Sequence, residues 1–514
     1  MNAALVAVVV ACSVAAVVLA GVRWLRVAQR EHYLPGRVSR IAVLWLSRSR
    51  LDLLLAAVAA LLAGAACVRS LAILAIPAAV LVVALPRGLG IRGSTSALGW
   101  TARLRRLVAV WAVVEVGVGT LLVWLLGPGA LALLAVATPV TLDAALALMD
   151  VVERRLSAPF IAQAQRRMAR VRPQVVAVTG SYGKTSTKGY IAHLLSASTA
   201  VVASPASFNN RLGLSRAVND GLVDGTEVFV AEMGTYGPGE IRELCRLFPP
   251  DIAVITTIGE AHLERMRTKA TVLAAKSEIT ERAGTVVLPV DAPELAELAE
   301  RCRAAGKRVV TCTVAGAQAD VSVDLAGGLV TLVSPDGTTT SHPVGAGVAH
   351  AVNLAVALGV VLAVGADQGS LTARLRSLPR AAHRAELQDT GTGLLVVDDT
   401  YNANPIGAHA ALAEAAALAK DHHGALVVVT PGIVELGPVQ EERNAEFARA
   451  AAQAGAHLVV VGRTNRAALV AGAQQGGGTF DVVDHRAQAV PLATARAGSA
   501  GVILYENDLP DHYP

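Results

Sequence analysis

The chain has 514 residues, which at roughly 150 residues per domain excludes a protein with one small core. Hydrophobic residues make up 53% of it and charged residues only 17%, with a mean hydropathy of +0.50, so disorder is excluded and part of the chain is expected to lie in lipid. Residues 1–150 carry a net charge of +8 and the remainder carries −3, which places the positive excess in the apolar part and excludes a nucleic-acid partner as its explanation.

Five apolar runs in the first 150 residues approach the length of a bilayer crossing, about 17 to 25 residues in a helix. We therefore expect residues 1–150 to form a transmembrane domain of five helices. The second and third runs are short and are expected to form a tight hairpin, with one long broken helix as the alternative. The runs cover residues 3–22, 51–67, 71–86, 107–126 and 130–149.

The placement of arginine predicts how these spans are oriented, because cytoplasmic loops retain Lys and Arg. Residues 23–50 hold seven arginines and residues 87–106 hold five, whereas the connections on the opposite side hold only Arg69. We expect the N-terminus outside the cell membrane and everything after residue 150 in the cytoplasm. A cleaved signal peptide at residues 1–22 is the alternative, but this run has no basic residue before its apolar core.

Two acidic residues fall inside the predicted spans, Glu115 in the fourth and Asp143 in the fifth. Ionisable groups at that depth are costly and are functional candidates by default. A carboxyl group that is hydrogen-bonded between helices is the alternative, and the sequence leaves both open.

A basic linker, residues 151–172, follows the last predicted span. Its residues 156–172 have an amphipathic pattern that suits a helix lying on the cytoplasmic membrane surface. Pro173 is expected to end this helix.

A glycine-rich loop, TGSYGKTST at residues 179–187, follows the apolar strand Val175–Val178 and precedes a helical pattern that runs to about Ser196. A phosphate-binding loop requires this order of strand, loop and helix. Lys184 would neutralise the β and γ phosphates of a nucleotide, and Thr185 would ligate Mg²⁺, with a chance turn and a surface lysine as the alternative. The residues expected to contact the nucleotide here are Gly180, Ser181, Gly183, Lys184, Thr185 and Ser186.

From residue 173 onward the sequence resembles the Mur ligases, which build the stem peptides of peptidoglycan, and most closely the type that adds D-alanyl-D-alanine to the UDP-muramoyl tripeptide. The resemblance implies a P-loop α/β central domain, residues 173–378, on a mostly parallel sheet, and a Rossmann-like α/β C-terminal domain, residues 379–514. Alternating apolar strands and alanine-rich helices favour the α/β class directly. Besides the loop, the motifs that carry the resemblance are SFNNRLG at 207–213, AEMGTYGPGEI at 231–241, TTIGEAHLERM at 256–266, AAKSEI at 274–279, DDTYNANP at 398–405 and PGIVELG at 431–437.

The resemblance implies an acidic metal ligand at Glu232 and a ligand of a second metal ion at His262, for which a helix cap and a surface loop residue are the alternatives. It also implies that Lys276 carries a carbamate, formed from CO₂ on a deprotonated amine, with an ordinary solvated lysine as the alternative. Lys184, His262 and Lys276 are therefore the expected catalytic residues.

Further residues are placed by the resemblance alone. Asn209 and Asn210 match the segment beneath the muramoyl peptide, where amides can hold peptide carbonyls and carboxylates, although a turn would use the same residues. The resemblance implies that five further residues contact the nucleotide, namely Asn353, Arg384, Asp399, Tyr401 and Asn402. The last four would reach it across the cleft between the α/β domains.

The activity implied is that of a ligase that transfers the γ-phosphoryl group of ATP to a carboxylate and lets an amine attack the acyl phosphate. Positioning and charge neutralisation supply most of the catalysis of the first step, so ATP and Mg²⁺, one ion or two, are the expected cofactors. The expected partners are an amino acid or dipeptide as amine donor and a peptide as acceptor.

Two departures from the family shape a further hypothesis. The domain that holds the UDP part of the substrate is replaced by the apolar residues 1–150, so we hypothesise an acceptor that is lipid-linked or close to the membrane. The Lys-Gly-Ser tail motif is replaced by Glu506-Asn507-Asp508, an acidic ending that would alter how the amine substrate is held. The alternative functions are a membrane-anchored poly-γ-glutamate synthase, a P-loop ATPase that drives a membrane process, and a scaffold that has lost activity.

Overall fold

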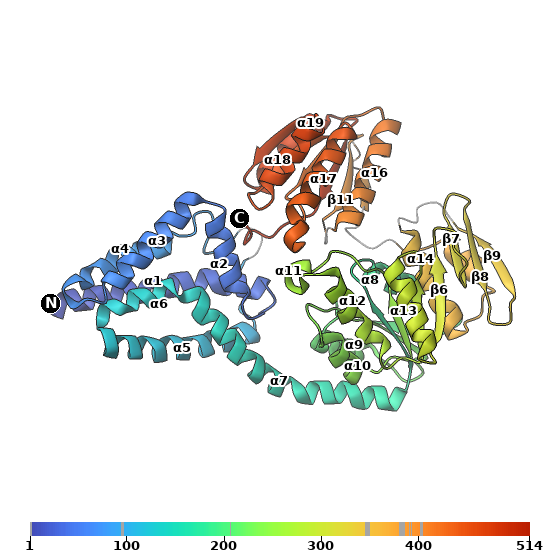
Figure 1. The fold of residues 1–514 in the computed structure, drawn as a ribbon, viewed down its shortest axis with the longest axis horizontal. Helices are drawn as coiled ribbons and strands as arrows, with labels where there is room; N and C mark the ends of the chain where they lie inside the picture. The colour runs from blue at the N-terminus through green and yellow to red at the C-terminus, as the bar shows by residue number, and fades with distance from the viewer. Residues whose placement is uncertain are drawn as a thin grey trace.

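The computed structural model describes residues 3–93, 97–205, 207–344, 350–379, 386–389, 391, 393–400 and 404–514. It shows an N-terminal helical domain beside two α/β domains, with the chain running from the helical domain along one long helix into the central domain (Figure 1).

The helical domain packs around a core in which tryptophan and leucine side chains of several helices meet, including Trp24, Trp45, Trp111 and Leu146. It also contains two short 3₁₀ helices, η1 (Arg69–Leu74) and η2 (Pro128–Ala130). Its α-helices are α1 (Ala3–Arg30), α2 (Arg37–Ser47), α3 (Arg50–Ala65), α4 (Ala75–Ala84), α5 (Ala102–Leu126), α6 (Leu131–Val136) and α7 (Thr138–Val171).

Among the described residues, α1 and α5 are long and apolar enough to cross a membrane, by length and composition. The pair Pro128–Val136 and α7 would be a third span, but it is bent by 73°. The second and third predicted spans are α3 and the broken segment Arg69–Ala84, which lie against each other as the expected hairpin and are shorter than a full crossing. The structure thus supports two of the five predicted spans, or three if the bent pair is one span.

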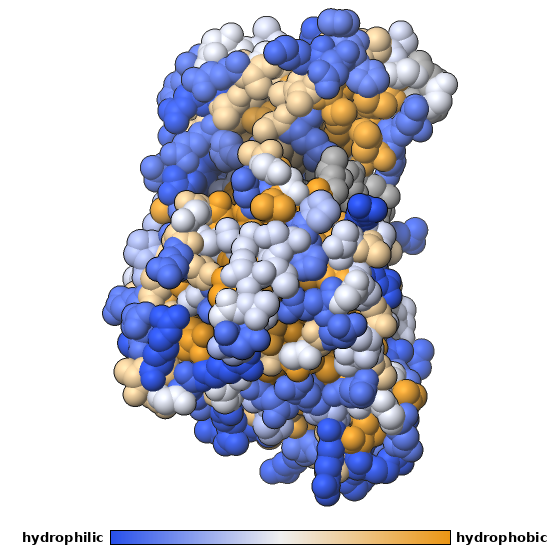
Figure 2. Space-filling view, turned by 90° about the vertical axis from the view of Figure 1, so that its right-hand side faces the viewer, coloured by the Kyte–Doolittle hydropathy of each residue, from blue (hydrophilic) through white to orange (hydrophobic). Residues whose placement is uncertain are grey.

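Apolar side chains are exposed on the surface of the helical domain. On α5, Val113, Val116 and Trp124 are 73%, 69% and 80% exposed, and Leu61 of α3 is 74% exposed. Contiguous apolar surface of this kind marks contact with lipid or with a partner. Figure 2 views the molecule from the side of the α/β domains, where hydrophilic residues predominate.

The last predicted span and the basic linker do not form separate elements. The chain bends at Ala137, and α7 then continues through residue 171 with Pro159 inside it. Its second half packs on the central domain, where Arg154 pairs with Glu243 and Arg170 pairs with Asp224. The predicted amphipathic helix is therefore present, but it contacts a protein surface.

Both acidic residues of the predicted spans are hydrogen-bonded between helices. The carboxylate of Glu115 accepts the hydroxyl hydrogen of Thr141. Asp143 accepts the backbone N–H groups of Val38 (3.2 Å) and Ser39 (2.8 Å), which belong to the first turn of α2. A carboxylate at the N-terminus of a helix satisfies N–H groups that lack helical partners, so Asp143 fixes where α2 begins.

The central domain is built on a sheet with the strand order β2-β3-β1-β4-β5-β6-β7-β8-β9 within the described residues. Parallel pairing runs from β2 through β7, as the mostly parallel prediction requires, and an antiparallel meander of β7 to β9 extends the edge. The strands are β1 (Gln174–Thr179), β2 (Val201–Ala203), β3 (Val228–Glu232), β4 (Ile252–Ile255), β5 (Thr285–Pro289), β6 (Arg308–Thr313), β7 (Val321–Asp324), β8 (Leu329–Val333) and β9 (Thr339–Pro343).

Helices cover both faces of this sheet, which explains why its parallel strands are continuous apolar runs. One face carries α8 (Lys184–Leu195), α14 (Ala351–Val364) and α15 (Leu371–Leu375). The other carries α9 (Arg211–Gly221), α10 (Glu240–Leu247), α12 (Lys269–Ser277) and α13 (Pro293–Ala304), with the short α11 (Leu263–Met266) and η3 (Glu278–Thr280) beside them.

The C-terminal domain has a second sheet, with the order β10-β11-β15-β12-β13-β14 within the described residues. All its pairs are parallel except β10 with β11. Its elements are β10 (Glu386–Asp389), β11 (Leu395–Asp399), α16 (Pro405–Asp421), β12 (Leu426–Thr430), η4 (Gly437–Val439), α17 (Gln440–Gln453), β13 (His457–Val461), α18 (Arg466–Gln475), β14 (Phe480–Val483), α19 (Arg486–Ala497) and β15 (Val502–Glu506).

The residues after β15 return to the helical domain, where the C-terminus lies near α2 in Figure 1. The indole N–H of Trp45 donates to the carbonyl of His512 at 2.8 Å, and Arg26 pairs with Asp511 at 2.7 Å. The helical domain is thus attached to the central domain through α7 and to the C-terminal domain through this tail.

Candidate active site

The predicted phosphate loop connects β1 to α8 and requires glycine at two positions. Gly180 and Gly183 have φ of 154° and 78°, in the region that L side chains rarely adopt. A Cβ atom would lie 1.9 Å from Thr256 Oγ1 at Gly180 and 2.1 Å from Asn353 Oδ1 at Gly183. The loop therefore has the form predicted for phosphate binding, and Asn353 of α14, predicted to contact the nucleotide, lies directly against it.

Two lysines meet at this loop. Lys184 Nζ donates to the carbonyl of Gly180 at 2.8 Å, and Lys276 Nζ donates to the same carbonyl at 3.0 Å. Lys276 is 1% exposed, and burial, together with the charge of Lys184, lowers the pKa of its amine well below the ordinary value. The structure thus provides the buried, easily deprotonated amine that a carbamate requires, and it rules out a solvated Lys276.

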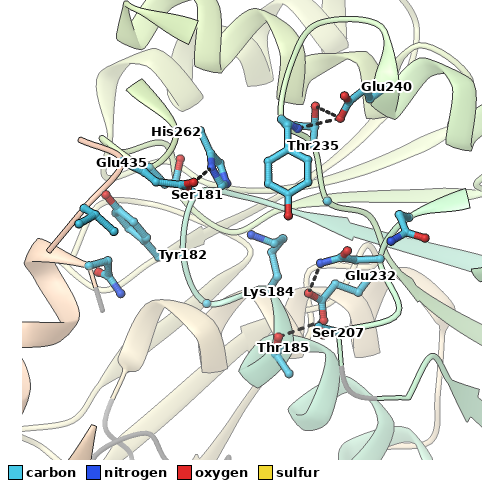
Figure 3. Close-up of a pocket in the computed structure, with 18 of the residues that line it drawn as sticks. Ser181, Tyr182, Lys184, Thr185, Ser207, Glu232, Thr235, Glu240, His262 and Glu435 are labelled. Atoms are coloured by element: carbon cyan, nitrogen blue, oxygen red, sulfur yellow. Dashed lines mark hydrogen bonds and ion pairs between the residues drawn. The ribbon is translucent and has the colours of Figure 1, made fainter. Parts of the chain in front are cut away.

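Glu232 ends β3, directly beside β1, and its carboxylate collects three donors. Thr185 Oγ1 donates at 3.0 Å, Lys188 Nζ at 2.9 Å and Asn209 Nδ2 at 3.4 Å. The predicted ligands Thr185 and Glu232 are therefore adjacent, next to Lys184 (Figure 3). Lys188 was not predicted, although its position four residues after Lys184 on the same helix was an available signal.

His262 faces the C-terminal domain across the site. Its Nδ1 lies 3.1 Å from Glu435 Oε2, and its ring is edge-on to Tyr236, with a centroid separation of 5.4 Å. Burial lowers the pKa of His262, so its ring is neutral near pH 7 and the N–H is on Nδ1. This leaves the lone pair of Nε2 for a metal ion, as in metal-binding histidines whose other nitrogen donates to a carboxylate.

Glu435 is the partner of His262 and was not assigned a role from sequence. Burial alone would raise the pKa of this carboxyl group, but the hydrogen bond from His262, the charge that His262 carries once it is protonated in acid, and the charges of Arg37 and Arg265 lower it to about 2. Because His262 and Glu435 are 173 residues apart, no local pattern connects them.

One pocket is lined by eight of the sixteen predicted site residues. Gly183, Lys184 and His262 line it from the central domain, and Asn404 and Glu435 line it from the C-terminal domain. Figure 3 shows His262 and Glu435 on one side of Lys184 and Glu232 on the other. The other lining residues that were predicted are Ser181, Thr185, Asn209, Asn210 and Glu232.

The two asparagines have different roles in the structure. Asn210 caps α9 by accepting the N–H of Gly213 at 2.9 Å, as the turn alternative predicted. Asn209 instead points its amide at Glu232. Both still line the pocket, so Asn209 is the better placed of the two to contact a substrate.

Several predicted residues lie away from the pocket or outside the described residues. Ser186 is in the first turn of α8 but does not line the pocket. Asp399 ends β11, and its carbonyl accepts the N–H of Asn507 at 3.1 Å, away from the pocket lining. The predictions for Arg384, Tyr401 and Asn402 fall outside the described residues.

Glu506, the first residue of the acidic ending, is buried in the C-terminal domain. Glu506 is 0% exposed, accepts the hydroxyl hydrogen of Thr430, and has an Oε1 atom with no partner among the described residues. Burial, with a smaller contribution from Asp399, raises the pKa of Glu506 to about 8. The carboxyl group is therefore protonated near pH 7 and adds no negative charge to the site.

Within the described residues, no group of three or more His, Cys, Asp or Glu side chains gathers to hold a metal ion. Mg²⁺ does not need such a cage, because it is usually held by one or two protein oxygens together with water and substrate phosphates. The hydroxyl of Thr185 and the carboxylate of Glu232 are oxygen donors of this kind beside the phosphate loop.

Comparison with known proteins identifies the two α/β domains. Residues 178–361 match the Mur ligase middle domain, and residues 383–505 match the domain described as "Mur ligase, glutamate ligase domain". The chain belongs to the Mur ligase family. These matches confirm the resemblance inferred from the motifs.

The relatives of this Mur ligase include UDP-N-acetylmuramoyl-tripeptide–D-alanyl-D-alanine ligases. The one from Mycobacterium leprae is 31% identical over 259 residues, which is 46% of this chain and 49% of that protein. The one from Bacillus subtilis is 31% identical over 277 residues, 53% of this chain and 59% of that protein. The chain thus spans about half the length of the relatives it matches.

Solved structures confirm the fold of the two domains. MurF from Acinetobacter baumannii superposes with a TM-score of 0.57 at 24% identity, over 68% of this chain and 77% of that one. The MurF ligase from Thermotoga maritima, determined in complex with ADP, has a TM-score of 0.54 at 23% identity, over 68% of this chain and 80% of that one.

Proposed function

We propose that this Mur ligase is an ATP-dependent carboxylate–amine ligase of peptidoglycan synthesis, which joins an amino acid or dipeptide to a stem peptide. One observation carries the proposal: Lys184, Thr185, Glu232 and His262 line one pocket of the central domain, and Glu435 of the C-terminal domain closes it. The names of the relatives support a dipeptide donor such as D-alanyl-D-alanine.

The residues of the chain account for phosphoryl transfer by position and charge. The N–H groups of the loop and of the first turn of α8 hold the phosphates, and Lys184 neutralises charge on the transferred group. An oxygen of the acceptor carboxylate attacks the terminal phosphorus, and ADP leaves. The amine then attacks the acyl carbon, phosphate leaves and the amine loses a proton, which gives the amide.

Thr185 and Glu232 are the residues that would hold Mg²⁺, and Nε2 of His262 would hold a second ion. A bound ion would supply further neutralisation of the phosphate oxygens. Lys276 is proposed to react with CO₂, in which its amine nitrogen bonds to the carbon and releases a proton. The resulting carbamate would be an anion beside Lys184, in place of a second buried cation.

The helical domain is proposed to place this site at the cytoplasmic surface of a membrane. In this arrangement the N-terminus is outside, and α1, α5 and the bent pair formed by Pro128–Val136 and the first half of α7 cross the bilayer. The helices α3 and α4 lie beside them as a short hairpin that does not cross. Two observations support it, namely the exposed apolar side chains of α5 and the clustering of arginines in residues 23–50 and 87–106. The acceptor would then be lipid-linked, since the site is already at the membrane.

The test is a ligation assay with the purified full-length protein, ATP and Mg²⁺. Candidate amines, including D-alanyl-D-alanine and glutamate, are combined with a UDP-linked or a lipid-linked muramoyl peptide, and products are identified by mass spectrometry. We expect one addition per acceptor, ADP release that requires both substrates, and loss of both in Lys184→Ala but not in Lys420→Ala, which changes an exposed lysine of α16.

The other outcomes separate the alternatives. A ladder of glutamate additions would instead identify a poly-γ-glutamate synthase. ATP hydrolysis that is independent of any amine would identify an ATPase, and no turnover at all would identify a scaffold. Full activity on the UDP-linked peptide with none on the lipid-linked one would overturn the lipid-linked acceptor.

A further inference from the structure

The helical domain reaches the edge of the active-site pocket through one buried residue, Arg37, the first residue of α2. Its guanidinium group is 7% exposed and contacts a carboxylate from each of the three domains. It pairs with Glu31 of the helical domain, with Glu264 of the central domain at 3.4 Å, and with Glu435 of the C-terminal domain at 3.2 Å.

The helical domain holds Arg37 firmly in this place. Asp143 of α7 caps the first turn of α2 and so fixes the backbone that carries Arg37. Glu31 is itself buried, at 6% exposure, between Arg37 and His512 of the tail, with 2.9 Å between His512 Nε2 and Glu31 Oε1. A planar guanidinium with several fixed donors is suited to bridging three carboxylates in this way.

From Arg37 the contacts lead directly into the site. Glu435 uses Oε1 for Arg37 and Oε2 for Nδ1 of His262, so one carboxylate connects the helical domain to the predicted metal ligand. The backbone of Glu435 is also held, because its carbonyl accepts the N–H of Glu264 at 3.2 Å.

His262 and Glu435, which contact each other, both have a strained backbone. His262 and Glu435 have φ of 62° and 66°, a strained conformation that a non-glycine residue keeps only where its surroundings impose it. The contacts of Glu435 with Arg37 and Glu264 are such surroundings.

We propose that Arg37 is a positioning residue of the ligase: through Glu435, it holds the ring of His262 in the orientation that the reaction uses. The helical domain then contributes a positioning residue to the active site, in addition to its proposed role at the membrane. This inference rests on the proposed ligase function for its kinetic part only, because the restraint on Glu435 and His262 can be measured without turnover.

The test compares four full-length proteins: wild type, Arg37→Gln, Arg37→Lys and the control Arg106→Gln. Arg106 lies in the same domain and pairs with the buried Glu153 at 2.6 Å, but it is outside the pocket and the junction. Hydrogen exchange is followed in peptides that cover residues 261–267 and 431–439. MgATP affinity, and kcat and KM in the ligation assay, are measured on the same samples.

Arg37→Gln is expected to raise exchange in both peptides and to lower kcat by about 10- to 100-fold, the scale of a small misplacement in an active site. MgATP affinity should stay within about threefold, because Arg37 does not line the phosphate loop. Arg37→Lys should recover part of kcat, since an ammonium keeps the charge but cannot bridge three carboxylates. Arg106→Gln should match wild type in every readout.

Unchanged exchange in Arg37→Gln would overturn the proposal, and so would raised exchange without a fall in kcat. An equal loss of MgATP affinity and kcat would also overturn it, because that result indicates general unfolding. If Arg37→Gln does not fold, the same criteria apply to Arg37→Lys. If wild type forms no amide, the proposed function fails, whereas the exchange comparison still decides whether Arg37 restrains His262 and Glu435.

Discussion

The buried ion pair between Lys188 and Glu232 allows a stability prediction whose size follows from the structure. The side chains are 6% and 2% exposed, and Lys188 Nζ is 2.9 Å from Glu232 Oε2. Lys188→Met keeps most of the apolar stem but leaves the carboxylate buried without its cation. Removing one partner of a buried pair costs about 3–5 kcal/mol. Because Thr185 and Asn209 still donate to Glu232, we expect the low end, about 3 kcal/mol.

The measurement is the thermal unfolding of the central domain in the full-length protein without nucleotide. For a domain of roughly 200 residues, this loss corresponds to a Tm lower by about 6–12 °C. The matched control is Lys269→Met, which removes a lysine that is 56% exposed from its pair with Glu294 and should cost about 1 kcal/mol or less. The double variant Lys188→Met with Glu232→Gln should recover most of the loss, since no unpaired charge remains. The reasoning would be refuted if Lys188→Met behaved like the control, or if the double variant were no more stable than the single one.

Three further predictions concern the loop, the buried amine and the tail. Gly183→Ala should weaken ATP binding about tenfold or more in a nucleotide titration, because its Cβ would lie 2.1 Å from Asn353 Oδ1 at a φ of 78°. The control Gly189→Ala has open space around it and should not weaken ATP binding. Lys276 should give a carbamate signal in ¹³C NMR with ¹³CO₂, and this signal should fade as the pH falls and the amine protonates. The signal should be absent in Lys276→Arg. If wild type gives no signal at any pH, the carbamate is contradicted. Glu506 has a folded pKa of about 8, above its value in the unfolded chain, so its own contribution to stability should be complete below about pH 4 and should be lost, by a few kcal/mol, as the pH rises to 8. The difference in unfolding free energy between wild type and Glu506→Gln should therefore change over this pH range.

The sequence predicted those parts of the site that depend on neighbouring residues. The strand, the two glycines and Lys184 follow one another along the chain, so a local pattern specifies the phosphate loop and its chemistry. Glu232 lies beside this loop because it ends a strand that pairs with β1, and the carboxyl ends of parallel strands meet at one edge. Both adjacent α/β domains follow from the same alternation of strands and helices.

The contacts that complete the site join distant segments, and for these the sequence carries no local signal. Glu435 meets His262 only because the two α/β domains face each other. Arg37 reaches Glu435 only because α2 starts where Asp143 caps it. The sequence likewise did not show that the last predicted span and the linker share one helix. Hydropathy falls at residue 150, but helix formation does not depend on hydropathy, and α7 continues to residue 171.

The junction at Arg37 also limits how this ligase can open and close. A reaction through an acyl phosphate favours closure of two domains over the cleft, which excludes water. If the C-terminal domain swings away, Arg37 can stay with Glu264 or follow Glu435, but it cannot keep both. Either choice breaks one ion pair of the closed junction. Opening of the cleft is therefore coupled to the helical domain.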